Sequence, residues 1–122
     1  MSQRFAAVVR LRSRADFTLV QQRGRRLATR YLTLLGLPNS RQVDRLGIVA
    51  SRKIGGAVVR NAAKRRLRDI FRRLQPDCAG ERHGSCLDIV AIARHELTAA
   101  PLSVLEPDFA LALDRLRARC RP

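Results

Sequence analysis

Residues 46–72 read LGIVASRKIGGAVVRNAAKRRLRDIFR, and this stretch decides the fold. It opens on a short run of apolar and β-branched residues, which is typical of a strand, and Gly55 and Gly56 break that pattern. From about Ala57 to Leu74 the apolar residues recur with the period of an α-helix, and Pro76 marks its end. A strand, a glycine turn and a long helix in this order indicate a domain that packs helices on a sheet.

The predicted helix carries cations along one face and apolar residues along another. At about 100° per residue, its core face consists of Val59, Ala63, Leu67, Ile70, Phe71 and Leu74. The polar face consists of Arg60, Asn61, Lys64, Arg65, Arg68 and Arg72, and the helix's only acid, Asp69, lies beside it. A solvated face normally mixes signs, because like charges one turn apart repel each other. We therefore predict a phosphate-binding face, on which Asn61 adds an amide for a base edge or a ribose; a solvated face is the alternative.

The flanking segments extend the pattern to six elements. Ser13 has the character of a helix N-cap, and Gly24 that of the C′ residue that follows a helix. Strands are predicted at Tyr31–Leu37, Arg45–Ser51 and Leu87–Ala93, and a last helix at about Pro107–Cys120. The order is therefore α-β-β-α-β-α. It predicts an α/β (α+β) two-layer sandwich with one central sheet, in a single RNA-binding domain that spans residues 1–122.

Net charge is the strongest signal for function. The chain has 25 lysines and arginines against 10 acidic residues, which gives a formal net charge of +15. Nucleic acid is the commonest partner of so basic a domain. A membrane surface fits less well, because lipid-binding basic helices carry bulky apolar residues opposite the charge and no folded domain around them. Residues 1–12 are predicted to form a flexible basic arm that orders on RNA, with a solubilising tail as the alternative.

The sequence predicts neither a catalytic residue nor a metal site. A chain that cleaved RNA by itself would need paired carboxylates for metal ions, or a histidine base beside a nucleophile. Its acids are scattered, and His83 and His95 have no obvious partner. Cys78, His83 and Cys86 resemble part of a zinc site, but a fourth ligand at the usual spacing is missing. The odd number of cysteines and the lack of an apolar N-terminal segment lead us to expect a reduced, cytoplasmic setting.

The stretch quoted above also resembles the signature of the bacterial ribonuclease P protein component. In that family a strand ends in Ser-Lys-Lys or a similar tripeptide, and a glycine turn leads into a helix that opens with Arg-Asn-Arg and continues with a Lys-Arg pair. Ser51-Arg52-Lys53 and Arg60-Asn61-Ala62-Ala63-Lys64-Arg65 match these motifs in place. Ala15-Asp16-Phe17 is similar to the family's first helix and Asp88–Arg94 to its central strand, so the resemblance covers nearly the whole chain.

The resemblance implies both a fold and a function. The fold would be similar to a domain of a small-subunit ribosomal protein, with a left-handed β-α-β crossover in place of the usual right-handed one. The protein would be the accessory subunit of ribonuclease P, in which a catalytic RNA removes the 5′ leader from precursor tRNA. Its partners would be the catalytic RNA and precursor tRNA, with no membrane and no obligate protein partner, and Mg²⁺ would be held mainly by the catalytic RNA and the substrate. A structural ribosomal-type protein without processing activity is the alternative, and the motif between Ser51 and Arg68 favours the ribonuclease subunit.

The resemblance also assigns roles to individual residues. Contacts with the catalytic RNA would come from Arg60, Asn61, Lys64, Arg65 and Arg68. The leader would bind to Phe17, Ser51, Arg52, Lys53 and Arg94. Phe17 would either stack on a leader base or fill the core, and the sequence leaves both open. Ala62 stands where the family usually has a cation and Gln21 where it often has a second aromatic residue, so both surfaces depart from the family in part.

Overall fold

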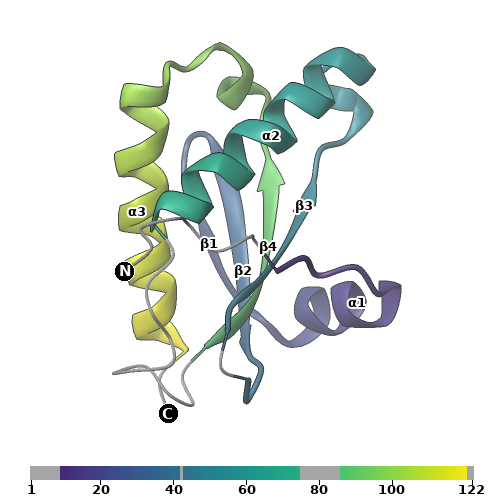
Figure 1. Ribbon diagram of the computed structural model, residues 1–122, viewed down its shortest axis with the longest axis vertical. Helices are drawn as coiled ribbons and strands as arrows, with labels where there is room; N and C mark the ends of the chain where they lie inside the picture. Colours follow the sequence, from purple (N-terminus) through teal and green to yellow (C-terminus); the bar gives the residue numbers. More distant parts are fainter. Residues whose placement is uncertain (1–8, 42, 75–85, 121–122) are drawn as a thin grey trace, which may run out of the picture.

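The computed structural model describes residues 9–41, 43–74 and 86–120 of the chain (Figure 1). The helices are α1 (Arg14–Arg23), α2 (Ala57–Leu74) and α3 (Leu102–Arg119), and the strands are β1 (Arg25–Ala28), β2 (Leu32–Pro38), β3 (Arg45–Val49) and β4 (Leu87–Ala93). Two short 3-10 helices, η1 (Arg52–Ile54) and η2 (His95–Ala99), follow β3 and β4. The predicted α+β class is confirmed, but the predicted order lacked β1. That strand has four residues of which only Leu27 is buried, so it has no apolar run by which to recognise it.

The four strands form one mixed sheet in the order β1-β2-β4-β3. Strand β2 pairs antiparallel with β1 and with β4, whereas β3 pairs parallel with β4. Two neighbouring parallel strands need a crossover connection, and α2 provides it between β3 and β4. The left-handed sense that the family resemblance implies for this crossover stays a prediction. Because β3 and β4 are parallel, their carboxyl ends lie at the same edge of the sheet.

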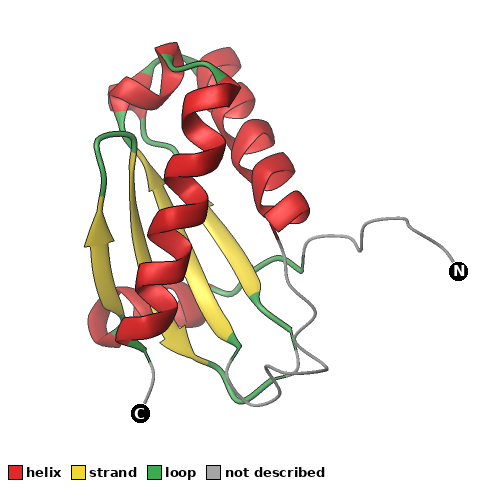
Figure 2. Cartoon of the chain, turned by 90° about the vertical axis from the view of Figure 1, so that its left-hand side faces the viewer, coloured by secondary structure: helices red, strands yellow, loops and turns green. Residues whose placement is uncertain are grey.

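The two faces of the sheet are covered to different extents. Since strand side chains alternate, Leu34 and Ile89 point into a core shared with α2 and α3, while Leu35 and Val90 point to the other face. The two long helices lie side by side along the first face, as Figure 2 shows. In Figure 1, α1 lies at the lower right, away from both long helices, and it contacts β2 and β4 on the second face. The predicted two-layer sandwich describes the side of α2 and α3, and α1 adds cover to part of the opposite face.

The apolar face predicted for α2 is mostly confirmed. Ala63, Leu67, Ile70 and Phe71 are buried, and the ring of Phe71 lies 6.2 Å from that of Phe109 on α3. The prediction was wrong for Val59, which is 38% exposed. This residue lies in the first turn of α2, close to the Gly55 turn that leads into the helix, so little of the core reaches it.

Two helix boundaries also differ from the prediction. The Ser13 N-cap of α1 is confirmed, since its Oγ accepts a hydrogen bond from the Asp16 N–H at 3.4 Å. Gly24 ends α1, but in extended conformation and not in the left-handed C′ form. Glycine is needed there because a Cβ would lie 3.0 Å from the Gly36 carbonyl oxygen and closer still to that of Val20. Helix α3 begins at Leu102 and runs through Pro107, which removes only one backbone donor from the helix.

Candidate nucleic-acid interface

A short N-terminal segment, residues 9–12, extends the sheet beyond β3. The Leu46 N–H donates to the Val9 carbonyl at 2.9 Å, and the Leu11 N–H donates to the Leu46 carbonyl at 3.0 Å, so Arg10 pairs in parallel with Leu46. Successive side chains of an extended segment point to opposite sides. Leu11 accordingly joins the apolar cluster on the α1 side, and Arg10 and Arg12 lie on the side of α2.

Between this segment and α2 lies a groove with a volume of about 770 Å³, which we call the basic groove. One wall is the extended segment and the other is the polar face of the helix. The groove is lined by Arg10, Arg12, Asn61, Lys64, Arg65, Arg68, Asp69 and Arg72. Six of these eight side chains are cations, so the groove concentrates positive charge on two facing walls.

The positive charge of the basic groove is hardly compensated within the described parts of the chain. Asp69, its one acid, already pairs with Arg72 at 2.5 Å and with Arg73 at 3.6 Å. Among the described residues no ion pair engages Arg10, Arg12, Lys64, Arg65 or Arg68. Burial and the nearby charge of Arg10 lower the pKa of Arg68, which indicates how closely the two walls approach. A groove of this kind favours a polyanion.

Four of the five residues predicted to contact a catalytic RNA line the basic groove: Asn61, Lys64, Arg65 and Arg68. Arg60 is not among its lining residues. It is half-buried in the first turn of α2, and its Nε is buried without a hydrogen-bond partner in the described part of the chain. The sequence analysis placed Arg10 and Arg12 in the predicted basic arm of residues 1–12 but did not select them as individual site residues. The local alternation Arg10-Leu11-Arg12 indicates an extended segment with both cations on one side, but it does not indicate the pairing with Leu46.

A second candidate surface lies on the α1 side of the sheet. The Phe17 ring packs over Gly47 of β3, next to a buried cluster that contains Leu35 and Val90. Val49 and Ile92, paired with each other across β3 and β4, lie one row further along the strands and are only half-buried. We call Phe17, Val49 and Ile92 the apolar strip. Phe17 is partly exposed, so it belongs both to the cluster beneath it and to the surface.

The remaining residues predicted to bind a leader follow the carboxyl ends of β3 and β4. Ser51, Arg52 and Lys53 follow β3 after Ala50, and Arg94 comes directly after β4; all four are exposed. Ser51 also caps η1, because its Oγ accepts the Lys53 N–H at 3.3 Å. The Arg94 N–H donates to the Tyr31 carbonyl at 3.0 Å, which fixes the backbone there. Parallel pairing therefore places these polar side chains at one edge of the sheet, beyond the apolar strip.

An ion-pair network holds α1 against this face. Arg45 on β3 donates to both carboxylate oxygens of Asp88 on β4, at 2.8 and 2.6 Å, and lies 3.5 Å from the Asp16 carboxylate on α1. The hydrogen bonds to Asp88 raise the pKa of Arg45. Asn39 donates to the same Asp88 at 2.9 Å. The network joins α1 to both parallel strands one row below Gly47.

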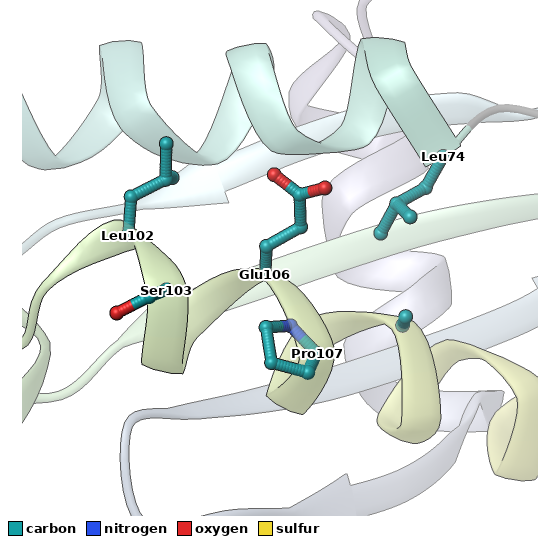
Figure 3. A pocket seen from close by; sticks show the side chains of 6 residues that line it. Leu74, Leu102, Ser103, Glu106 and Pro107 are labelled. Carbon is teal, nitrogen blue, oxygen red and sulfur yellow. The ribbon is translucent and has the colours of Figure 1, made fainter.

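A shallow pocket of about 510 Å³ between α2 and α3 is mainly apolar (Figure 3). Leu74 and Leu102 border it, and Glu106 points from α3 towards α2. The Glu106 carboxylate is engaged by Arg73 at 2.8 Å. Of the polar side chains that line the pocket, Glu106 is therefore engaged in an ion pair between the two helices, and Ser103 adds a single hydroxyl.

The described residues offer no candidate metal centre and no helix that could cross a membrane. They contain no group of three or more histidine, cysteine or acidic side chains that could hold a metal ion. Of the zinc-like string, Cys78 and His83 lie outside the described residues, as do residues 1–8 of the predicted arm, and Cys86 is buried. None of the described helices has the length and apolar character needed to cross a membrane.

Comparisons with known proteins agree on one family. A family model described as Ribonuclease P matches residues 5–117. The ribonuclease P protein component of Erythrobacter litoralis is 39% identical over 107 residues, which cover 88% of this chain and 84% of that protein. The counterpart from Paramagnetospirillum magneticum is 39% identical over 119 residues, covering 93% and 86%.

Solved structures give the same answer. The ribonuclease P protein of Staphylococcus aureus superposes with a TM-score of 0.72 at 28% identity, covering 88% of this chain and 94% of that one. That of Thermotoga maritima gives a TM-score of 0.71 at 34% identity, covering 89% and 96%.

Proposed function

The chain belongs to the ribonuclease P protein family, and on that premise we propose that it serves its ribonucleoprotein through two separate RNA-binding surfaces. As a ribonuclease P protein component it is the accessory subunit of an endoribonuclease that processes tRNA, and it works together with an RNA subunit. A purely structural ribosomal protein is not favoured, because the family match extends over residues 5–117 and not only over the basic helix.

The first proposed surface is the basic groove, which binds the backbone of the catalytic RNA. The observation that carries this proposal is the presence of unpaired cations on both walls of the groove within the described residues. When a protein cation neutralises a phosphate, the counterions condensed on the RNA there are released, and this release adds to the affinity. Lys64, Arg65 and Arg68 supply one wall, with Asn61 able to donate to a ribose or a base. Arg60 is not among the residues that line the groove, but it directly precedes Asn61, and we propose that it joins this helix wall.

The second proposed surface is the apolar strip together with the polar edge beyond it, and it binds the 5′ leader of precursor tRNA. Single-stranded nucleic acid is bound by stacking platforms that are combined with cations for the backbone. Phe17 offers the aromatic ring, and Val49 and Ile92 continue the platform. Ser51, Arg52, Lys53 and Arg94 would meet the phosphates where the platform ends. Because the two surfaces lie on different sides of β3, catalytic RNA and leader can be bound at the same time.

Chemistry is assigned to the RNA and not to this chain. We expect Mg²⁺ to be held mainly by the catalytic RNA and the substrate phosphates, with the protein cations lowering the density of negative charge around them. No side chain of the protein takes a catalytic role in this proposal. The working location that we expect is the cytoplasm, where precursor tRNA would be met.

Reconstitution tests the proposed function. The purified chain is mixed with a bacterial ribonuclease P RNA, and cleavage of a precursor tRNA is followed across Mg²⁺ concentrations. We expect the chain to raise cleavage most at low Mg²⁺ and to cleave nothing by itself. Cleavage by the protein in the absence of RNA, or no enhancement at any Mg²⁺ concentration, would contradict the proposal.

A further inference from the structure

Gly47 lies in the middle of β3, is buried, and sits directly beneath the ring of Phe17. A Cβ at this position would lie 2.8 Å from Cε1 and 3.1 Å from Cε2 of the ring, and closer still to Cζ. Real Cβ atoms essentially never approach a neighbour below 3.0 Å. Glycine in a strand interior gives up side-chain packing, and such a glycine often marks a close approach by another group. Here the group is the far edge of the Phe17 ring, which rests on the backbone of β3.

Helix α1 cannot easily shift to make room for a Cβ at position 47, because the helix is fixed at both ends. At its N-terminal end Ser13 caps the helix, and Asp16, the residue before Phe17, pairs with Arg45 at 3.5 Å. At its C-terminal end Gly24 packs so closely on the Gly36 carbonyl that a Cβ would lie 3.0 Å from that oxygen. The distance of the Phe17 ring from the sheet is therefore set by the residue beneath the ring, which is Gly47.

We propose that Gly47 is a positioning residue for leader recognition: by admitting the Phe17 ring down to the β3 backbone, it keeps the ring level with Val49 and Ile92. The three side chains then form one continuous platform that leads to the polar edge at Ser51 and Arg94. This inference rests on the leader role proposed for Phe17. An added Cβ at position 47 would lift the ring out of that platform without removing any group that contacts RNA.

The first test compares Gly47→Ala with Gly36→Ala. Gly36 is a buried strand glycine of β2 whose added Cβ would lie 2.8 Å from the Leu116 side chain, on the opposite face of the sheet. Both variants crowd the interior, but only the first touches Phe17. The readout is the affinity of the reconstituted holoenzyme for precursor tRNA divided by its affinity for mature tRNA. We expect Gly47→Ala to lower this ratio about 5-fold, the lower end of what one stacked base contributes, and Gly36→Ala to preserve it.

A second pair of variants separates the inference from the proposal beneath it. Leucine at position 17 lacks the ring edge, so Gly47→Ala is accommodated in a Phe17→Leu background even if it disturbs folding alone. We expect Phe17→Leu to lower the ratio and the added Gly47→Ala to change it no further. If Gly47→Ala folds and keeps the wild-type affinity ratio, or if the double variant has a lower ratio than Phe17→Leu, the role of Gly47 is overturned. The leader role of Phe17 is not affected by either result. An unchanged ratio in Phe17→Leu overturns the leader role of Phe17 and this inference with it.

Discussion

Lys64 and Arg65 are the residues on which the basic groove can be tested most directly. Neither makes an ion pair among the described residues, so an alanine at either position removes a cation without freeing a carboxylate. We expect Lys64→Ala and Arg65→Ala each to weaken binding of ribonuclease P RNA, and to flatten the log–log salt dependence of the affinity by up to about 1. Filter binding or fluorescence anisotropy across salt concentrations measures both effects.

Arg115→Ala is the matched control for these two variants. It removes the same unit of charge from an exposed position on α3, outside the basic groove. We expect it to leave the salt slope nearly unchanged. If all three variants lose the same affinity, binding depends on net charge alone, and the groove is not a specific RNA site.

Cys120 gives a prediction about pH. Burial raises the pKa of its thiol, with partial opposition from the charges of Arg25 and Arg117. An unperturbed thiol titrates at about 8.5, so in the folded chain Cys120 stays protonated where the unfolded chain has begun to lose its proton. The unfolded state then binds fewer protons, and stability contributed by this group falls as pH rises through that range. Peptide mass mapping after iodoacetamide treatment should show slower alkylation of Cys120 in the native chain than in urea; equal rates would contradict the assignment.

At the scale of elements, a buried ion pair connects α3 to the sheet. Asp44, just before β3, is fully buried; it pairs with Arg117 of α3 and accepts the Leu87 N–H of β4 at 2.7 Å. Removing one partner of a buried pair leaves the other charge uncompensated. We expect Asp44→Ala to lower the free energy of unfolding by about 3–5 kcal/mol, measured by urea denaturation. Asp114→Ala, which removes an exposed carboxylate of α3, should change the free energy of unfolding by less than about 0.5 kcal/mol. Equal losses in the two variants would contradict a particular contribution of the buried Asp44 pair to stability.

The N-terminal segment is the element that completes the basic groove. Its two backbone hydrogen bonds to Leu46 hold Arg10 and Arg12 opposite α2. We expect the pair of changes Arg10→Ala and Arg12→Ala to weaken RNA binding at least as much as Lys64→Ala, while the ratio of affinities for precursor and mature tRNA stays unchanged. Arg14→Ala with Arg23→Ala, which removes two exposed cations of α1, is the control. A loss no larger than in that control would leave α2 as the only RNA-binding wall.

The elements that the sequence predicted are those whose signal is local. Helix α2 was predicted with its bounds, because an apolar period and a turn of glycines lie within one stretch. Strand β1 was missed, because four residues with one buried side chain become a strand only by pairing with β2. The same holds for the groove. The helix wall follows from a helical wheel, whereas the wall of Arg10 and Arg12 depends on a parallel pairing with Leu46, 36 positions away, that no local pattern specifies.

At the scale of the whole molecule, the net charge of +15 favours RNA binding but lowers the stability of the free protein. The cations that would bind RNA repel one another in the free protein, as the effect of Arg10 on Arg68 illustrates. Salt shortens the range of this repulsion from about 30 Å at 0.01 M to about 8 Å at 0.15 M. We therefore expect the Tm of the free chain to rise by a few degrees between these two NaCl concentrations, measured by circular dichroism.

The variant that combines Lys64→Gln with Arg68→Gln lowers the net charge from +15 to +13 by relieving the basic groove itself. We expect this variant to have a higher Tm than the wild type at 0.01 M NaCl and to gain less from added salt, while it binds ribonuclease P RNA more weakly. The opposite order of stabilities would show that the groove cations are stabilised by contacts within the fold. In that case the cations of the groove would stabilise the fold itself, and the binding of an RNA backbone in the groove would need another explanation.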